Sequence, residues 1–343
     1  MKQNKLTAVL VALLFSMGGS TANATAWRVN HDTTTGAHFA SITAAMSSED
    51  VAEGDTLYLD PACLLGSAAK VNKRVTIIGC GYFRSTSPHP FARHTGTLTI
   101  TAAGTKLEGL WCGAINLQAA NITVERCYVT GTIQSNNKAH TGIVIRQCYI
   151  STGGNAVRGA NTSAYLTNAI IENNIILSQH YEFVVGYIDN TIVRNNYIRY
   201  TSSSSSYCVR YGVNAVIYNN VLLNNYRTEQ ILKVDSNCRS YNNIYSSATT
   251  DEKNHNYGLG SADAAAIFAM NGNNDERYSE LKDDSPAKGW GVDGADCGPS
   301  GGLYPYIPGG MAAYHPYYTN AVISKTSDGT GINVSLKIKM QNE

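Results

Sequence analysis

The sequence predicts an all-β protein, a right-handed parallel β-helix (solenoid) in which short strands stack coil upon coil. One segment recurs six times, its corners lie 21 to 26 residues apart, and four of the copies carry two adjacent Asn residues behind a strand of mostly aliphatic residues. A repeat of this length with these features is typical of a solenoid. The copies are Val124–Val129, Ile145–Ile150, Ile171–Ile176, Val193–Ile198, Ile217–Leu222 and Ser240–Tyr245.

Each copy contains one corner residue, at which the strand ends. Asn tolerates left-handed backbone angles, and its amide can bond to the copies above and below, so the Asn corners are expected to act as structural staples. Cys127 and Cys148 hold this position on neighbouring coils, where stacked strands lie about 4.8 Å apart. That distance permits a disulfide, but two stacked, buried thiols are the favoured alternative. The corner residues are Cys127, Cys148, Asn174, Asn196, Asn220 and Asn243.

The chain has 343 residues, of which 43% are hydrophobic and 15% are charged, and this composition argues against disorder. Residues 1–24 resemble a signal peptide, since Lys2 and Lys5 lead into the apolar run Leu6–Phe15 and Ala22–Ala24 is a small-x-small cleavage site. The run is too short to span a bilayer, so we expect no transmembrane segment. With the two lysines removed, 26 basic against 25 acidic residues become 24 against 25, which argues against a nucleic-acid partner. We expect an exported protein that is periplasmic, secreted or held at the cell surface.

The patterns on either side of the repeats predict how the solenoid begins and ends. Phe39–Met46 has apolar residues at helical spacing and is expected to cover the first coil, because an open sheet edge recruits other chains. Strands are expected at Thr56–Leu59, Val75–Ile78 and Leu98–Ile100, but the repeat does not set the register of the coils before residue 120. After the signal peptide we expect an N-terminal cap at 25–60, β-helix coils at 61–250, a final irregular coil and cap at 251–310, and a small C-terminal β element at 311–343.

The repeat also predicts an outward-facing ladder beside the corners. Acid and base alternate along it over four coils, and neighbouring opposite charges attract. A charged binding stripe is one interpretation, and a ladder that satisfies its own charges is the favoured one. Its residues are Glu125, Arg146, Glu172, Arg194, Tyr218 and Tyr241.

A second outward ladder is expected on the short strand that follows each corner and its loop. It does not alternate in sign, and unpaired Arg and Lys on one face suit the recognition of carboxylates or sulfates. Ordinary solvated side chains, paired with Asp235 and Glu229, are the competing interpretation. The expected ladder is Gln134, Arg158, Val185, Arg210 and Lys233.

Several segments resemble those of secreted right-handed parallel β-helix proteins of the pectate-lyase-like superfamily, of the kind common in Bacteroidetes. The resemblance implies the fold and says little about activity, because this fold carries lyases, hydrolases, esterases, adhesins and proteins of unknown role. Its segments are Trp27–Asn30, Phe39–Ile42, Gly54–Pro61, the Asn-Asn corners, which resemble that superfamily's Asn ladder, Asp284–Gly289, Asp296–Gly298 and Pro305–Ile307.

The sequence offers few carboxylates for hydrolysis. Between residues 61 and 250, Asp occurs only at positions 189 and 235, so a two-carboxylate hydrolase has few candidates and a glycoside hydrolase is the less favoured enzyme. A polysaccharide lyase remains, similar to the chondroitinase B and alginate lyase group, which is described as using a Lys base and an Arg, often with calcium. That resemblance makes Lys233 and Arg210 the candidate catalytic residues.

We therefore expect binding of an anionic polysaccharide, with β-eliminative cleavage as an extension of it, and a non-catalytic adhesion or structural scaffold as the alternative. No cofactor is evident, no metal ligands are assigned, and Ca²⁺ would enter only with a lyase. The candidate substrate-binding residues are Arg158, Tyr187, Tyr207, Glu229 and Asp235.

Overall fold

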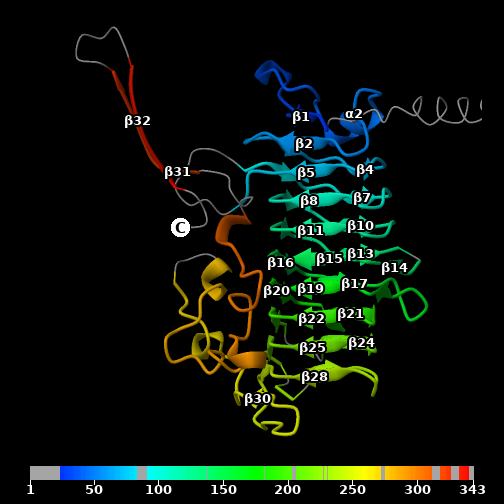
Figure 1. Ribbon diagram of the computed structural model, residues 1–343, viewed down its shortest axis with the longest axis vertical. Coiled ribbons are helices and arrows are strands. Elements are labelled where there is room, and N and C mark those ends of the chain that lie inside the picture. Colours follow the sequence, from blue (N-terminus) through cyan, green and yellow to red (C-terminus); the bar gives the residue numbers. More distant parts are fainter. Residues whose placement is uncertain are drawn as a thin grey trace, which may run out of the picture.

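The chain folds into a parallel β-helix in which three long parallel sheets, here called A, B and C, run along one axis (Figure 1). The computed structural model describes residues 24–82, 91–136, 138–180, 182–202, 206–226, 228–229, 231–271, 275–310, 317–325 and 332–339. The predicted signal peptide lies outside these residues, apart from its last position. The architecture confirms the predicted all-β solenoid.

Sheets A and B each hold ten strands, and from β8 to β28 a two-residue corner joins each sheet A strand to the sheet B strand that follows it. Sheet A consists of β1 (Ala26–Val29), β2 (Thr56–Leu59), β5 (Thr76–Ile78), β8 (Lys106–Glu108), β11 (Thr123–Glu125), β15 (Val144–Arg146), β19 (Ile170–Glu172), β22 (Ile192–Arg194), β25 (Val216–Tyr218) and β28 (Arg239–Tyr241). Sheet B consists of β3 (Leu64–Leu65), β6 (Arg93–His94), β9 (Trp111–Cys112), β12 (Tyr128–Val129), β16 (Tyr149–Thr152), β20 (Ile175–Ser178), β23 (Tyr197–Tyr200), β26 (Val221–Asn224), β29 (Ile244–Tyr245) and β30 (Tyr257–Gly258).

Sheet C follows sheet B in each coil and carries the second outward ladder. Two of its strands, β21 and β24, are seven residues long, and β21 pairs with two separate strands of the preceding coil, β17 and β18. Its members are β4 (Ala69–Val71), β7 (Leu98–Ile100), β10 (Ile115–Leu117), β13 (Ile133–Ser135), β14 (His140–Thr141), β17 (Val157–Arg158), β18 (Leu166–Thr167), β21 (Phe183–Asp189), β24 (Tyr207–Val213) and β27 (Leu232–Lys233).

The interior of the solenoid is a column of aliphatic side chains, one set from each coil. The middle residue of each sheet A strand points inward, because successive side chains on a strand alternate between the two faces. These inward residues stack in register and are fully buried: Leu57, Ile77, Leu107, Val124, Ile145, Ile171, Val193 and Ile217. The pairing of Glu108 with Glu125 supplies the register of the early coils that the repeat left open.

The first coil is covered as the sequence predicts. The short helix α2 (Ile42–Ser47) begins at Ser41, whose hydroxyl accepts a 3.0 Å hydrogen bond from the N–H of Ala44. Phe39 forms a bridge to Val29 and so covers part of the outer edge of β1. The 3₁₀ helix η1 (Thr33–Thr35) lies in the same region.

Each corner between sheets A and B uses two adjacent residues. The first residue adopts a left-handed conformation with φ between 51° and 56°, as at Asn195 (φ 53°), and the second turns its side chain into the coil. The left-handed residues of the six repeats are Arg126, Gln147, Asn173, Asn195, Asn219 and Asn242. The predicted corner residues are the second members of these pairs, and all are fully buried.

The buried Asn side chains form a continuous ladder along the axis. Asn196 accepts a 3.0 Å hydrogen bond from the N–H of Asn174 and donates a 2.8 Å bond to the carbonyl of Ile171 on the preceding coil. The pattern repeats from coil to coil and ends at Asn256, one rung beyond the repeats read from the sequence. The predicted role of Asn as a structural staple is confirmed.

Cys127 and Cys148 continue this ladder as free thiols. The Cys148 thiol donates to the carbonyl of Val124 (3.4 Å), which is the contact that an Asn amide makes elsewhere in the column. Burial raises the pKa of Cys148, so this thiol keeps its proton and remains a donor. Stacked thiols, rather than a disulfide, are what the structure shows.

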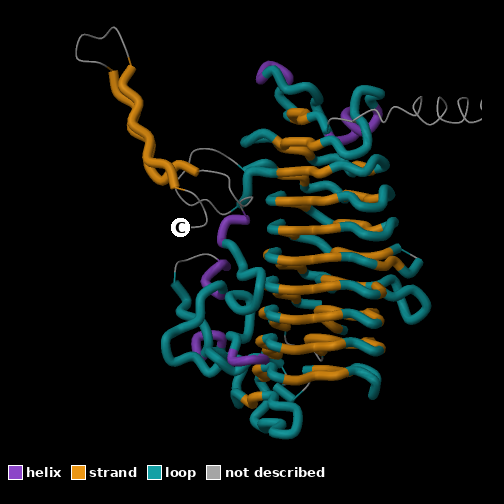
Figure 2. The backbone as a smooth tube through the Cα atoms, viewed as in Figure 1, coloured by secondary structure: helices purple, strands orange, loops and turns teal. Residues whose placement is uncertain are grey.

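The C-terminal part of the chain returns along the outside of the solenoid (Figure 2). Residues 290–310, here called the strap, run antiparallel to the order of the coils. The left-handed corner residues meet successive strap residues: Asn242 bonds Trp290, Asn219 bonds Val292, Asn195 bonds Asp296, Asn173 bonds Pro299 and Gln147 bonds Pro305. The sequence predicts a cap that closes the end of the solenoid. The structure shows that the strap also covers its side.

A second hydrophobic cluster lies between sheet B and this returning chain. Tyr149 and Tyr197 point outward from sheet B and are fully buried there, and Tyr197 packs against Phe268 and Tyr278. Short 3₁₀ helices shape the return: η2 (Ala264–Ala266), η3 (Asp275–Tyr278), η4 (Val292–Gly294) and η5 (Pro308–Gly310). Beyond the strap, β31 (Tyr317–Lys325) and β32 (Ile332–Lys339) form an antiparallel hairpin.

A buried carboxyl joins the far end of this returning chain to an early coil. Glu276 is 7% exposed and accepts hydrogen bonds from the Tyr306 hydroxyl (2.9 Å) and the Gly309 N–H (2.6 Å). The hydroxyls of Tyr306 and Tyr82 lie 2.9 Å apart. Burial raises the pKa of Glu276 to about 7, because its effect exceeds that of the two hydrogen bonds.

The two corner positions predict different costs of mutation. Asn196→Ala leaves the N–H of Asn174 and the carbonyl of Ile171 without their partner, and each buried unsatisfied group costs about 1–3 kcal/mol. Asn195→Gly keeps the left-handed backbone and loses one bond to the strap, at about 1 kcal/mol. We expect Asn196→Ala to lower the free energy of unfolding at least twice as much in urea titrations. Equal losses would contradict the separate roles of the two positions.

The buried carboxyl predicts a pH dependence of stability. Between about pH 4.5 and 7 the unfolded chain releases the proton of Glu276 while the folded chain retains it, so the free energy of unfolding falls as pH rises through this window. The shift corresponds to about 3 kcal/mol. Glu276→Gln should remove that part of the slope when urea unfolding of both proteins is compared at pH 5, 6, 7 and 8. Identical slopes would show that Glu276 ionises equally in both states.

Candidate functional site

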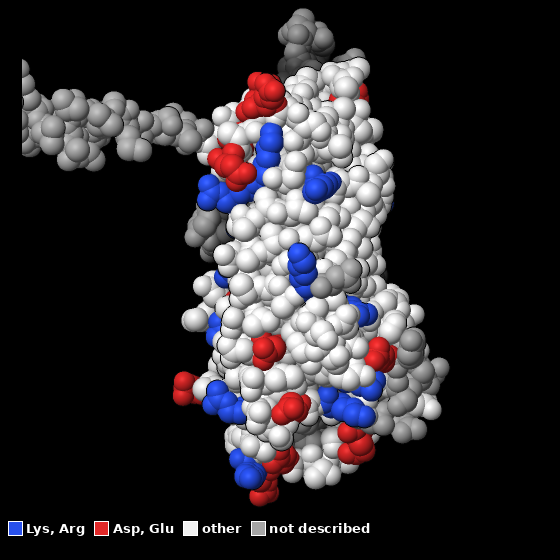
Figure 3. Space-filling model, turned by 90° about the vertical axis from the view of Figure 1, so that its right-hand side faces the viewer, with Lys and Arg blue, Asp and Glu red and all other residues white. Residues whose placement is uncertain are grey.

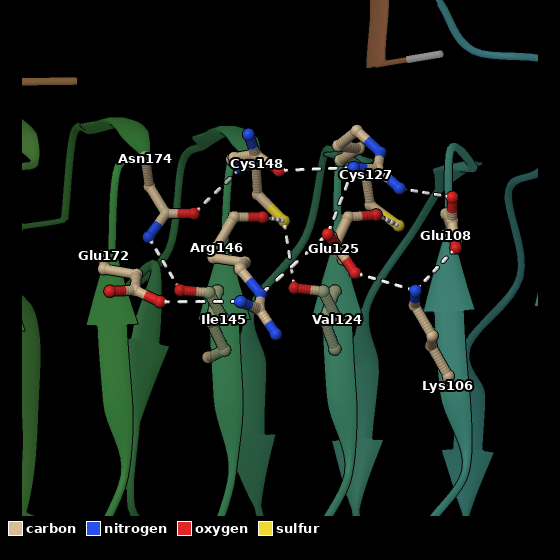
Figure 4. A network of polar contacts seen from close by, with 12 residues as sticks. Lys106, Glu108, Val124, Glu125, Cys127, Ile145, Arg146, Cys148, Glu172 and Asn174 are labelled. Carbon is tan, nitrogen blue, oxygen red and sulfur yellow. Dashed lines mark hydrogen bonds and ion pairs between the residues drawn. The ribbon is translucent and has the colours of Figure 1, made fainter. Parts of the chain in front are cut away.

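The outward ladder of sheet A satisfies its own charges (Figure 4). The Lys106 ammonium lies 2.7 Å from Glu108 and 2.8 Å from Glu125, so it bridges two acids that stack directly on one another. Further along, the guanidinium of Arg194 lies 2.6 Å from Glu172. Arg146 lies 3.9 Å from an acid on either side. The favoured interpretation, a structural ladder, is confirmed by these ion pairs.

The outward ladder of sheet C differs because it contains no acid. Strand pairing places eight residues in one column: Lys70, Thr99, Asn116, Gln134, Arg158, Gly186, Arg210 and Lys233. The adjacency of Arg210 and Lys233, and the position of Arg158 two coils from Arg210, agree with the sequence prediction. Figure 3 shows the side of the molecule beyond the sheet C strands of Figure 1, where charged side chains are scattered among uncharged ones.

One member of the predicted ladder is wrong by one position. Val185 is fully buried and pairs with Val157 and Val209 in the core, and Gly186 holds the outward position instead. Val184 and Val185 are both apolar, so the alternation that assigns inward and outward residues gave no signal in this coil.

Gly186 leaves a gap in the ladder between two arginines. Arg158 and Arg210 flank it on the adjacent coils, roughly 10 Å from one another. A Cβ atom at Gly186 would lie 2.7 Å from the Arg210 carbonyl and 2.7 Å from the Phe183 ring. The close packing of these groups therefore requires glycine here.

Arg210 is held mainly by aromatic rings. Its guanidinium lies 4.4 Å from the centre of the Tyr211 ring and 5.5 Å from that of Tyr207. Its Nη1 lies 3.6 Å from a Glu182 carboxylate oxygen, which is an ion pair but too long for a hydrogen bond. Its Nε is buried and has no hydrogen-bond partner among the described residues. Arg210 is thus fixed in place with donors that its described neighbours leave unused.

Two stacked tyrosines lie beside this arginine. The rings of Tyr187 and Tyr211 are 4.6 Å apart and nearly parallel, at 2°. Both residues have left-handed backbones, with φ of 53° and 55°. The Tyr211 hydroxyl donates a 3.1 Å hydrogen bond to Glu182, and burial, followed by that contact, raises the pKa of Tyr211. Tyr187 was predicted from the sequence, whereas Tyr211 and Glu182 were missed.

Arg158 has its donors largely engaged. Its Nε donates to the carbonyl of Gly159 (2.9 Å), its Nη1 to the side chain of Asn155 (3.2 Å), and its Nη2 to the carbonyl of Ala160. Its guanidinium also lies 5.3 Å from the centre of the Tyr187 ring. This arrangement suits a residue that shapes the loop after β17 and supports Tyr187.

The remaining predicted residues lie at the edge of this cluster. Lys233 is exposed, and its ammonium lies 5.8 Å from the Tyr207 ring. Asp235 accepts bonds within its own turn, and Glu229 accepts a bond from Ser247. Within the described part of the chain neither acid forms an ion pair with Arg210 or Lys233. A Lys side chain acts as a base where burial or a neighbouring cation favours its neutral form. Lys233 is exposed, so burial does not do this here.

Two cavities lie toward the ends of the solenoid, and neither is lined by Arg210, Tyr187, Tyr211 or Glu182. One of about 650 Å³ is lined by residues of the last coil, among them Tyr241, Tyr245 and His255. The other, about 460 Å³, lies beside α2 and is lined in part by the buried His94, whose pKa burial lowers to about 4. Over the described ranges, no group of three or more His, Cys, Asp or Glu side chains is arranged to hold a metal ion.

No protein-family model, no curated protein and no solved structure matches this chain. Among the described helices, none has the length and apolar character needed to cross a membrane. The architecture therefore rests on the observed strand pairing, and the candidate site rests on its own geometry: Arg210, Tyr207, Tyr187, Tyr211 and Glu182 together, with Lys233 at the edge.

The packing around Gly186 predicts a selective cost of adding a methyl group. Gly186→Ala should lower the free energy of unfolding by about 1–3 kcal/mol, because the new Cβ would overlap the Arg210 carbonyl and the Phe183 ring. Gly153→Ala is the matched control, since its Cβ would meet nothing within 4 Å. Urea unfolding of both variants makes the comparison, and equal stabilities would show that the coils can separate to admit the methyl group.

Proposed function

We propose that the protein is exported and binds an acidic polysaccharide on the outward face of sheet C, centred on Arg210 and the Tyr187–Tyr211 pair. The observation that carries the proposal is the setting of Arg210: a partly exposed guanidinium held over two aromatic rings, whose ion pair with Glu182 is too long for a hydrogen bond. Such a guanidinium can form charge-assisted hydrogen bonds to a carboxylate or sulfate. The exposed Lys233 on the next coil adds a second positive charge.

The shape and chemistry of the surrounding face support a chain-like ligand. The acid-free ladder continues over eight coils, about 34 Å at the usual strand spacing. It begins at Lys70 and ends at Lys233. The tyrosine rings provide flat apolar surfaces that suit the faces of sugar rings. The resemblance of the N-terminal and closing segments to those of secreted β-helix proteins supports export.

β-Elimination is the extension of this proposal, with Arg210 stabilising the charge that develops on a uronate carboxylate and Lys233 as the base. The proton beside the carboxylate would pass to the neutral amine of Lys233, the glycosidic carbon–oxygen bond would break as the carbon–carbon double bond forms, and the leaving oxygen would take up a proton from water. Binding has more support than cleavage, because burial would favour the neutral form that a Lys base needs and Lys233 is exposed. Tyr211, whose ring centre lies 4.4 Å from the Arg210 guanidinium, offers its hydroxyl as a second group for proton transfer.

Binding is tested by calorimetric titration with alginate, chondroitin sulfate and polygalacturonate, and with neutral dextran as control. We expect binding to at least one acidic polymer and none to dextran. Arg210→Ala should weaken binding at least tenfold, the size expected for a charge-assisted contact. Arg239→Ala, which removes an exposed arginine from sheet A, should have little effect.

Cleavage is followed in the same samples by the absorbance of unsaturated sugar ends, with and without calcium. Absorbance that disappears in Lys233→Ala would assign elimination to this site. Binding without absorbance would leave a glycan-binding protein. No binding to any acidic polymer would contradict the proposal and favour the non-catalytic scaffold.

A further inference from the structure

Glu182 lies where an acidic ligand would be expected to place its charge. One oxygen of its carboxylate accepts the Tyr211 hydroxyl hydrogen bond (3.1 Å) and lies 3.6 Å from Nη1 of Arg210. The side chains of Glu182 and Arg210 are 25% and 23% exposed, so both reach solvent at the same place. Glu182 is the one acid that forms an ion pair with Arg210 among the described residues.

The contact is looser than the close, hydrogen-bonded ion pairs of the sheet A ladder. Arg194 and Glu172 meet at 2.6 Å with a hydrogen bond, whereas Arg210 and Glu182 meet without one. A partly exposed pair of this kind is worth little, since water screens it. A ligand carboxylate or sulfate could replace it at the part of the guanidinium that reaches solvent.

We infer that Glu182 is an internal competitor for Arg210, a carboxylate that occupies the anion position of the empty site and that an acidic ligand must displace. This inference rests on the proposed function of the same site. It makes Glu182 a specificity-determining residue, because a ligand with a single weak contact gains nothing by displacing it. A ligand that engages Arg210 and the Tyr187–Tyr211 pair at once offsets the lost contact.

Two other roles for Glu182 lead to opposite effects on binding. If Glu182 only positions Arg210 and Tyr211, its neutralisation should loosen both and weaken binding of the acidic polymer. If Glu182 instead accepts hydrogen bonds from hydroxyls of a neutral sugar, binding should again weaken on neutralisation. Only the competitor role predicts that removing the charge improves binding.

The experiment compares Glu182→Gln with Glu280→Gln in the full chain. Glu182→Gln keeps an oxygen that can accept the Tyr211 hydrogen bond and removes only the charge. Glu280 is exposed in the returning chain, away from sheet C, and its described contact is with Asn271, so Glu280→Gln controls for the change in net charge. The probes are alginate, chondroitin sulfate and polygalacturonate, titrated by calorimetry at constant salt.

We expect Glu182→Gln to bind the acidic polymer about two- to fivefold more tightly than wild type, the range that a partly exposed ion pair supports. Glu280→Gln should change affinity by less than half of that. Tighter binding by Glu182→Gln alone, or binding only by that variant, supports the competitor role. Unchanged or weaker binding by Glu182→Gln, while wild type binds, overturns it and leaves the proposed function standing. No binding by either protein overturns both.

Discussion

The whole solenoid depends on how its corners between sheets A and B satisfy their backbone groups. A strand that ends at a corner leaves N–H and carbonyl groups that the sheet ladder no longer pairs, and buried groups of this kind must find partners. Each inward Asn satisfies two of these backbone groups: Asn196 accepts a hydrogen bond from the N–H of Asn174 and donates one to the carbonyl of Ile171. Each rung therefore needs the next one, which ties coils together along the axis.

The outward member of each pair explains why the motif is Asn-Asn rather than one Asn. Its left-handed backbone favours Asn over most other residues, and its amide then faces the returning chain. Asn242, Asn195 and Asn173 bond strap residues in reverse order, so the spacing of the coils sets the path of the strap. The returning chain ahead of the strap covers the tyrosines of sheet B, as where Phe268 and Tyr278 pack against Tyr197.

The fold was predictable from the sequence because its signals are local and repeated. The strand Thr56–Leu59 and the helix near Ile42 agree with the structure, and the Asn corners gave the register of six coils. The path of the strap was not predictable, since single backbone carbonyls such as that of Asp296 leave no mark in a sequence. Glu182 was missed for a related reason: it lies just before β21, outside the repeated positions.

The candidate site forms where the solenoid departs most from its own rules. Asn takes the left-handed conformation at the bend that follows these strands, at Asn190 and Asn214, and β21 and β24 each hold a further left-handed residue within the strand, Tyr187 and Tyr211. A bulky residue in this conformation costs roughly 1–2 kcal/mol, and such departures cluster at functional sites. The stacking of the two rings offsets part of that cost, and it leaves a rigid pair of tyrosines beside Arg210. Asn would adopt this conformation at lower cost, so the two strained tyrosines are an argument for the proposed binding surface.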